Sequence, residues 1–295
     1  MRVAVVGAGV MGCATAWALR ERGAEVTVHE QFDLEHTRGS SHGRTRIFRL
    51  AYPEPYWIRL AQEAYSGWGE LDAELLGLYG LVELSPDPAL LSTRALEETG
   101  VPFRLLDSDE VLARGATLPD GWTALLTADA GVVFADRARH AFLDAAGVEV
   151  ETNRRIESTD ELDADVVVLT AGSWIRDLAP DLPVTVTRET LAYFRYDGPP
   201  RPCIVDLSAE TRTHAMYSLH DPVHGLKAGA HHGGAEADPD AEAEPDAAIV
   251  ERISAWVRER FPDVDPTPAE AQTCLYTSTG DQQFILERRG RVVVG

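Results

Sequence analysis

The stretch Val3-Ala4-Val5-Val6-Gly7-Ala8-Gly9-Val10-Met11-Gly12 decides the fold of the beginning of the chain. Its first four residues are apolar, which is typical of a strand buried on both faces of a parallel sheet. The glycines follow the G-x-G-x-x-G spacing: Gly7 allows a tight turn, Gly9 lets the backbone approach a pyrophosphate, and Gly12 lets the next helix pack closely. Since the N-terminus of that helix offers unpaired N–H groups, the stretch predicts a unit that binds phosphate groups.

The residues after this turn continue the same pattern. A helix is predicted up to Arg22, and a second apolar strand, Val26-Thr27-Val28, ends at Glu30. Glu30 lies eighteen residues beyond Gly12, where a carboxylate holds the hydroxyls of a ribose. The order strand, turn, helix, strand, acid therefore predicts an α/β, Rossmann-like domain that binds a dinucleotide.

The composition of the 295 residues narrows the class of protein. With 44% hydrophobic and 25% charged residues, the chain is typical of a globular protein with one large or two modest domains. A net charge of -21 repels phosphate backbones, so no nucleic acid is expected as a partner. No apolar run approaches the roughly 20 residues of a membrane span. Because the first residues form a core strand rather than a signal peptide, we expect a cytoplasmic protein with no membrane partner.

Cysteine and lysine are both rare. Cys13, Cys203 and Cys274 show no C-x-x-C spacing, so neither a metal site nor a disulfide framework is predicted, and buried thiols are expected. Of the 27 basic residues, 26 are arginines and Lys227 is the only lysine. Because arginine supplies almost every other cation, the lysine indicates a need for a compact ammonium with an adjustable pKa. An ordinary surface lysine is the alternative.

Later segments fit the same sheet as the first two strands. A helix is predicted over 136–146, followed by a strand over 148–150. A buried strand over 164–169 leads to a turn at Gly172, where a second segment of chain meets a bound dinucleotide. With a further strand over 291–294, one sheet built from three separated segments is predicted.

The segments between them follow other patterns. The helix predicted over 56–78 has an apolar stripe that we interpret as core rather than as a contact to a cofactor (Trp57, Leu60, Ala61, Ala64, Trp68, Leu71 and Leu75). Short β-like runs fill 185–230, an acidic loop covers 235–246 and a helix follows over 246–261. The prediction is a dinucleotide-binding domain made of 1–80, 130–182 and 270–295, and a discontinuous, β-sheet-rich substrate domain made of 81–129 and 183–269.

The loop Gly39-Ser40-Ser41-His42-Gly43-Arg44-Thr45-Arg46-Ile47-Phe48-Arg49 follows the second strand closely. It is placed to cover a cofactor, and Arg46 and Arg49 point to one side if the backbone is helical. An arginine there offers a planar fork to a carboxylate. Surface arginines are the alternative.

Five motifs carry a resemblance to a known family. The pattern G-S-x-H-G-x-T-R-I-x-R at 39–49 resembles the monomeric sarcosine oxidase family, which includes N-methyltryptophan oxidase and pipecolate oxidase within the D-amino-acid-oxidase-like flavoproteins. The others follow in the family's order: G-V-V-F at 131–134, A-G-S-W at 171–174, G-L-K-x-G-x-H at 225–231 and C-x-Y-T-x-x-x-D-x-x-F at 274–284. The similarity spans nearly the whole chain.

The resemblance implies FAD, not NAD, and a monomeric enzyme that oxidises a secondary (N-methyl or cyclic) amino acid such as sarcosine, with O2 reduced to H2O2. It implies that Cys274 bonds to the flavin 8α-methyl group, that Lys227 promotes the reaction with O2 and that Arg49 binds the substrate carboxylate. It also implies that His231, Tyr276 and Tyr217 line the substrate pocket. The remaining cofactor residues are then Gly7, Gly9, Gly12, Glu30, Ser40, Thr45, Arg46, Gly172 and Trp174.

Two features depart from the family. The hairpin over 149–165 is short, and the family's G-H-G-F-K segment, whose lysine also binds the substrate carboxylate, has no counterpart before the sequence stops at Gly295. The chain is therefore either a fragment or a protein that lost part of its flavin site. Two rival interpretations stay open: an NAD-linked dehydrogenase, and a truncated nucleotide-binding remnant without activity.

Overall fold

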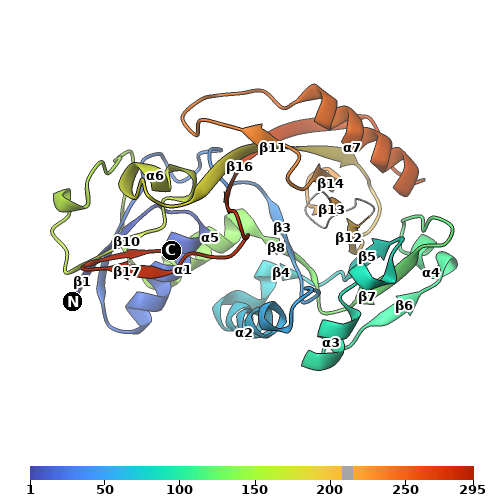
Figure 1. The fold of residues 1–295 in the computed structure, drawn as a ribbon, viewed down its shortest axis with the longest axis horizontal. Helices are drawn as coiled ribbons and strands as arrows, with labels where there is room; N and C mark the ends of the chain where they lie inside the picture. The colour runs from blue at the N-terminus through green and yellow to red at the C-terminus, as the bar shows by residue number, and fades with distance from the viewer. Residues whose placement is uncertain (208–214) are drawn as a thin grey trace.

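Three β-sheets organise residues 1–207 and 215–295, the part of the chain that the computed structural model describes. The first sheet has the order β17-β18-β10-β1-β2-β9, and all its neighbouring strands are parallel except β17 and β18. Its strands come from distant parts of the chain, as predicted, and Figure 1 shows the last strands of the chain beside β10. Their bounds are β1 (Arg2–Val6), β2 (Glu25–His29), β9 (Glu149–Glu151), β10 (Val166–Leu169), β17 (Glu287–Arg289) and β18 (Val292–Val294).

Helices cover both faces of this sheet. On one face, α1 (Val10–Glu21) and α5 (Ala135–Ala146) bury Ala16 and Phe142 against Val5 and Val28. On the other face, α6 (Ile175–Leu178) buries Ile175 with the strands. Both faces being apolar explains why β1 and β10 are continuous hydrophobic runs. The predicted strand–turn–helix–strand unit and the helix over 136–146 are confirmed.

The second sheet is larger and mostly antiparallel, with the order β15-β11-β14-β13-β12-β5-β7-β6 and with β16 paired to β11. The helix α7 (Ala247–Arg260) packs Ile253, Trp256 and Val257 against one face, as its sequence predicted, and Figure 1 shows it above β11 and β14. The strands are β5 (Leu81–Ser85), β6 (Arg104–Leu106), β7 (Thr123–Thr127), β11 (Val184–Arg195), β12 (Cys203–Asp206), β13 (Met216–Asp221), β14 (Gly225–Ala230), β15 (Ala235–Glu236) and β16 (Pro268–Thr279).

A small third sheet lies between these two. It joins β3 (Thr45–Phe48), β8 (Gly131–Phe134) and β4 (Leu76–Gly77), and the helix α2 (Pro55–Asp72) leads from β3 toward β4. The backbone of β3 is extended and not helical, so the condition under which Arg46 and Arg49 were expected to point to one side is not met. The other helices are α3 (Thr93–Thr99), α4 (Ser108–Leu112) and the 3-10 turns η1 (Ala73–Leu75), η2 (Pro88–Leu90), η3 (Thr159–Glu161) and η4 (Gly172–Trp174).

The two large sheets follow the segments expected for two domains, with one difference. Strand β16 hydrogen-bonds to β11, so residues 270–279 belong to the second sheet. We therefore propose the two-domain division with its last boundary after β16 rather than at residue 270. Residues 208–214 of the proposed substrate domain lie outside the described residues.

Candidate functional site

The glycine-rich turn between β1 and α1 is shaped by close backbone contacts. Gly7 has φ 103°, and a Cβ on it would lie 2.5 Å from the carbonyl oxygen of Thr170. A Cβ on Gly12 would lie 1.8 Å from the carbonyl oxygen of Gly7. A Cβ on Gly9 would meet only the side chain of Ser41, with Oγ at 3.1 Å. Gly7 and Gly12 are thus required by the fold itself, whereas Gly9 borders a flexible side chain and no backbone.

Glu30 lies at the end of β2 and faces this turn. Its Oε2 accepts the backbone N–H of Ala8 at 2.8 Å, and its Oε1 accepts that of Phe32 at 3.1 Å. The side chain is buried, so its orientation is fixed before any ligand arrives. Ser41 Oγ accepts the N–H of Val10 at 3.0 Å. Ser41 was not predicted as a site residue, although the Ser-Ser pair in the loop was visible in the sequence.

The turn after β10 lies beside the glycine-rich turn. Gly172 has φ 53°, and the hydroxyl oxygens of Ser173 and Thr277 are 2.9 Å apart, which ties this turn to β16. The buried Trp174 donates from Nε1 to Asp240 at 2.7 Å, and its ring lies 5.3 Å from that of Phe32. The Trp174 ring therefore packs against Phe32 and supports the loop that follows β2.

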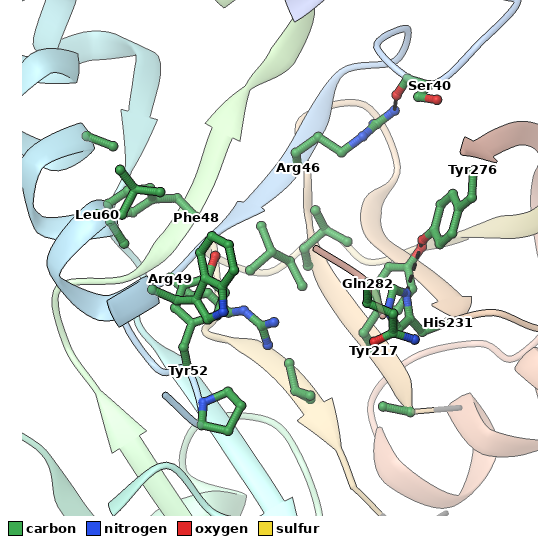
Figure 2. Close-up of a pocket in the computed structure, with 18 of the residues that line it drawn as sticks. Ser40, Arg46, Phe48, Arg49, Tyr52, Leu60, Tyr217, His231, Tyr276 and Gln282 are labelled. Carbon is green, nitrogen blue, oxygen red and sulfur yellow. Dashed lines mark hydrogen bonds between the residues drawn. The ribbon is translucent and has the colours of Figure 1, made fainter. Parts of the chain in front are cut away.

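A cavity of about 820 Å³ lies between β3, α2 and the second sheet. It brings together predicted residues from four separate segments, as Figure 2 shows for most of them. The other predicted residues do not line the cavity. They lie at the glycine-rich turn, at the turn after β10 and at the start of β3 (Gly7, Gly9, Gly12, Glu30, Gly172, Trp174 and Thr45). The predicted residues that line the cavity are Ser40, Arg46, Arg49, Tyr217, Lys227, His231, Cys274 and Tyr276.

The two arginines of the loop have different surroundings. Arg46 donates to the backbone oxygens of Ser40, His42 and Thr45 at 2.7, 2.6 and 2.9 Å, so its guanidinium holds the loop in shape. Arg49 lies over the Tyr52 ring, with Cζ 4.5 Å from its centroid, and no carboxylate within residues 1–207 and 215–295 pairs with it. Its fork is therefore available to an anion in the cavity.

Lys227 is a buried residue of β14 and not a surface lysine. It is 2% exposed, and Nζ donates to the backbone oxygen of Thr45 at 3.1 Å. Burial, reinforced by the charge of Arg46, lowers the pKa of Lys227 to about 7. Its amine thus faces the cavity with a charge that changes near neutral pH.

Cys274 lies on β16 beside the same cavity. Burial raises the pKa of its thiol, whereas Arg46 and Lys227 act in the opposite direction. The loop that carries Arg46 is fastened to β16 here, because Ser40 Oγ donates to the backbone oxygen of Leu275. The three cysteines are free and buried, as expected.

His42, which was not singled out from the sequence, fastens the same loop to β16 at a second point, two residues after Ser40. Its Nε2 lies 3.1 Å from the backbone oxygen of Thr273, so that nitrogen donates. Burial, together with Arg46, lowers the pKa of His42 to about 4, which keeps its ring neutral. Its buried Nδ1 is an acceptor without a partner among the described residues.

One part of the cavity lining consists of two tyrosines and a histidine, Tyr217, Tyr276 and His231. His231 Nδ1 lies 3.3 Å from the hydroxyl of Tyr276, and Tyr217 lines the cavity beside them (Figure 2). Burial raises the pKa of Tyr217 and of Tyr276, so both keep their protons. His232 packs on His231 with ring centroids 4.2 Å apart and has φ 51°. No sequence pattern singled out His232, and only its neighbour His231 belonged to a recognised motif.

The apolar stripe predicted over 56–78 is core only in part: Leu75 is buried and Leu71 packs against a core cluster, as interpreted, but other residues of the stripe line the cavity. Among the residues of α2 only Ile58 is buried, and the cavity is lined instead by Trp57, Leu60, Ala61, Ala64 and Trp68. Periodicity shows that one face of a helix is apolar, but it does not show whether protein or ligand covers that face. Phe284, 76% exposed, packs edge-on against Trp57 at 5.5 Å at the same wall.

The described residues exclude some other kinds of site. They contain no group of three or more potential metal ligands. None of their helices is long and apolar enough to cross a bilayer. These residues form a glycine-rich turn next to a cavity lined by a buried lysine, neutral tyrosines and an arginine that pairs with no described carboxylate. This combination is typical of one class of protein, enzymes that bind a dinucleotide.

Comparison with known proteins identifies the family. A family model described as FAD dependent oxidoreductase matches residues 2–295. Human peroxisomal sarcosine oxidase is 32% identical over 99% of this chain and 85% of its own length, and monomeric sarcosine oxidase of Bacillus sp. (strain B-0618) is 28% identical over 97% and 83%. The solved structure of NikD, an amino acid oxidase of nikkomycin biosynthesis, shares the fold with a TM-score of 0.86, at 24% identity over 99% of this chain and 88% of that one. The chain belongs to the FAD-dependent oxidoreductases.

Proposed function

We propose that this FAD-dependent oxidoreductase is an amine oxidase that converts a secondary amino acid to the imine and reduces O2 to H2O2. The observation that carries the proposal is the cavity that joins Arg49, which pairs with no carboxylate of residues 1–207 and 215–295, to Lys227 and Cys274. Relatives named sarcosine oxidase and N-methyl-L-tryptophan oxidase support an N-methyl amino acid as the substrate class. The relative named monomeric sarcosine oxidase supports a monomer.

The residues present fit FAD. At Gly9 the glycine-rich turn borders only the Ser41 side chain, Glu30 is buried and oriented toward this turn, and Nδ1 of His42 is a buried acceptor with no partner among the described residues. We propose that the first two hold the adenosine and pyrophosphate end, and that Ser40, Thr45 and Arg46 hold the loop against the ring system. The turn at Gly172 and Trp174 completes the cradle. When bound, FAD accepts two electrons from the C–H bond next to the amine and passes them to O2.

The side chains of the cavity then have separate tasks. Arg49 binds the substrate carboxylate in a fork and fixes the amine in the cavity. Tyr217, Tyr276 and His231 shape the pocket around the amine, and the two tyrosines do so as neutral hydroxyls. The Lys227 ammonium, held by the backbone oxygen of Thr45, stabilises negative charge as O2 is reduced. Water hydrolyses the released imine.

Activity on the substrate class tests the proposal directly. The purified protein is incubated with sarcosine, N-methyl-L-tryptophan or a cyclic secondary amino acid, and H2O2 is measured with O2 as the only acceptor. Glycine, which lacks the second substituent on nitrogen, is the matched control. H2O2 from one secondary amine, and not from glycine, supports the proposal. Reduction of added NAD without H2O2 would instead favour the rival dehydrogenase.

We also propose that the flavin is covalently bound through Cys274, since this buried thiol faces the cavity next to Lys227 and Arg46. Acid precipitation should leave the yellow colour in the pellet of the wild-type protein, and Cys274→Ala should release it to the supernatant. Cys203→Ala is the matched control. Cys203 is also buried, but its Sγ donates a hydrogen bond to the backbone oxygen of Gly131 and it does not line the cavity. Wild-type flavin that stays wholly in the supernatant contradicts the attachment.

A further inference from the structure

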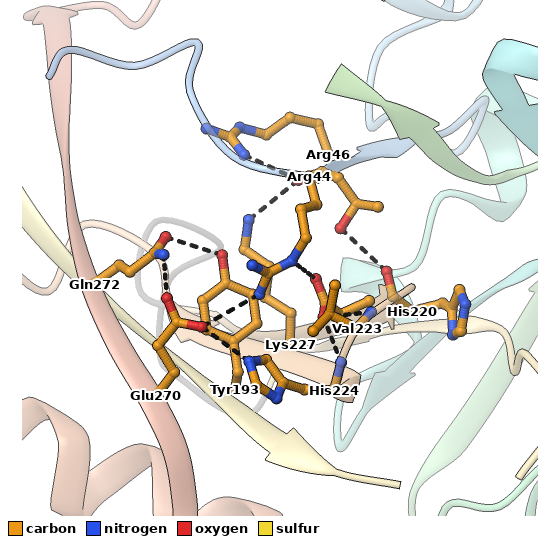
Figure 3. Close-up of polar contacts among 11 residues, drawn as sticks. Arg44, Arg46, Tyr193, His220, Val223, His224, Lys227, Glu270 and Gln272 are labelled. Carbon is orange, nitrogen blue, oxygen red and sulfur yellow. Dashed lines mark hydrogen bonds and ion pairs between the residues drawn. The ribbon is translucent and has the colours of Figure 1, made fainter. Parts of the chain in front are cut away.

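A partly buried ion pair lies close to Lys227 (Figure 3). Arg44 Nε donates to Oδ1 of Asp221 at 2.7 Å, and the Asp221 side chain is 0% exposed. Its Oδ2 accepts the backbone N–H groups of Val223 at 3.1 Å and of His224 at 2.7 Å. These three donors fix the Asp221 carboxylate at the turn between β13 and β14. Strand β14 begins at Gly225, two residues before Lys227.

The pair extends to β16 through polar side chains. Glu270 Oε2 lies 2.9 Å from Nε2 of His224 and 3.5 Å from Nη2 of Arg44. Gln272 Nε2 donates to Glu270 Oε1, and Gln272 Oε1 accepts the hydroxyl of Tyr193 at 3.0 Å. Arg44 is thus held by two carboxylates from two different strands.

Tyr193 links this network to Lys227. The two residues face each other directly in the antiparallel pairing of β11 and β14, so their side chains share one face of the sheet. The guanidinium carbon of Arg44 lies 4.4 Å from the centroid of the Tyr193 ring, and Nζ of Lys227 lies 5.9 Å from it. Both distances are within the reach of a cation–π contact. The ring is therefore a platform that two cations share.

The charges around Lys227 come from every element that surrounds it. Burial lowers its pKa most, and Arg46 of β3 and Arg44 lower it further. Cys274 of β16 and Asp221 of β13 raise it. Arg44 and Asp221 therefore act on the lysine in opposite directions while they hold each other in place.

We propose that Arg44 and Asp221 are positioning residues for Lys227, which hold the Tyr193 ring beneath the lysine and set the balance of charge that decides whether its amine is an ammonium. The proposal rests on the proposed function at one point only, the role of Lys227 in the reaction with O2. The sequence showed no sign of it, because residues 44, 193, 221 and 227 meet only through strand register.

The single lysine allows a direct test on the full chain as purified. Protein labelled with lysine carrying carbon-13 at Cε gives one side-chain signal, whose chemical shift against pH reports the protonation of Lys227 alone. Arg44→Gln removes a cation and should move the midpoint upward by about one pH unit, and Asp221→Asn removes an anion and should move it downward by about as much. Arg201→Gln is the matched control, since Arg201 also pairs with a carboxylate and stacks on a tyrosine, but next to Phe261 and Asp263.

Opposite shifts in the two variants, with no shift in the control, support the proposal. A purely structural role predicts another result: because burial is the largest cause of the lowered pKa, loosened packing admits water and moves both midpoints upward. Two upward shifts, or none, overturn the proposal. If Asp221→Asn does not fold, Glu270→Gln removes the second anion on Arg44 and should shift the midpoint downward by less. A further result separates the two proposals: opposite shifts, together with a Lys227→Met variant that reacts normally with O2. That result would support Arg44 and Asp221 as positioning residues and would contradict the proposed role of Lys227 in the reaction with O2.

Discussion

The turn between β1 and α1 and the cavity wall formed by β11, β14 and β16 are built in different ways. In the turn, backbone packs on backbone: a Cβ at Gly12 would collide with the carbonyl oxygen of the nearby Gly7, and a Cβ at Gly7 would collide with that of Thr170 after β10. In the wall, Lys227 and Cys274 come from strands that both pair with β11, and each meets its neighbours through register. The turn presents backbone N–H groups, whereas the wall presents side chains whose charges depend on each other. The turn therefore depends on glycines with a sequence spacing that can be recognised, whereas the wall depends on the pairing of strands that are distant in sequence.

The strongest test of the wall is Lys227→Met. The thioether keeps most of the volume but removes the charge that stabilises reduced oxygen, so reaction of the reduced protein with O2 should slow by roughly 100- to 1,000-fold, or about 2.7–4 kcal/mol. Reduction by substrate should change much less. Stopped-flow measurement of the two half-reactions checks this, and Lys227→Arg should recover only part of the rate, because its charge is spread. Equal losses in both half-reactions would assign the lysine to structure or substrate binding.

The pH dependence sharpens the same contrast. The pKa of Lys227 is lowered from 10.5 to about 7, so its amine is an ammonium below pH 7 and neutral above it. The rate constant for reaction with O2 should therefore fall as pH rises through about 7, by up to tenfold per pH unit. Lys227→Met should lose this dependence. A wild-type rate that rises over the same range would mean that another group controls the reaction.

Arg46 in β3 and Arg49 directly after it test whether the cavity binds a carboxylate. Arg49→Ala should weaken binding of an acetate-type inhibitor by about 1.5–3 kcal/mol, the range for hydrogen bonds to charged groups. Arg46→Ala is the comparison, because Arg46 donates to three backbone oxygens and should affect flavin content more than inhibitor affinity. Inhibitor titrations followed by the flavin absorbance measure both. Unchanged affinity in Arg49→Ala would place the carboxylate elsewhere.

The sequence predicted the turn region far better than the wall. The glycine spacing, the apolar strand and Glu30 lie within thirty residues, and each has a local geometric meaning that the structure reproduces. The family and its FAD cofactor followed from collinear motifs, and the family is confirmed. The roles of Lys227, Arg49 and Cys274 stay predictions.

Two features show why the rest could not be predicted. The α2 stripe was assigned wholly to the core although part of it lines the cavity, because an apolar helix face has the same period whether it covers protein or a cavity. A shared side for Arg46 and Arg49 was expected only for a helical backbone, and the pairing of β3 with β8 imposed an extended one. The Arg44–Asp221 pair was missed altogether, because strand register over 177 residues of separation is invisible in one sequence.

Two alanine variants in the turn separate folding from ligand binding. In Gly12→Ala the new Cβ meets the carbonyl oxygen of Gly7, so the free energy of unfolding should fall by about 1–3 kcal/mol. In Gly9→Ala the Cβ meets only the flexible Ser41 hydroxyl, so stability should change little while flavin content falls. Thermal melting and flavin absorbance of the purified variants measure the two effects. A Gly9→Ala variant with full flavin content would show that the pyrophosphate does not approach this glycine.

The smallest expected effect concerns Glu30, where local geometry and ligand choice coincide. Its two carboxylate oxygens already accept the N–H groups of Ala8 and Phe32, so their remaining lone pairs face the turn as acceptors. A ribose diol can donate to them, whereas a 2′-phosphate brings negative charge against negative charge. Flavin-free protein should therefore bind ADP more tightly than 2′-phosphorylated ADP in a displacement titration. Glu30→Gln should narrow that preference by about 0.5–1.5 kcal/mol, the net value of one hydrogen bond. Glu35→Gln is the matched control, because Glu35 lies in the same loop with its carboxylate exposed toward His140. Equal affinity of the wild-type protein for both nucleotides would remove Glu30 from the ribose site and leave it as a clamp on the turn alone.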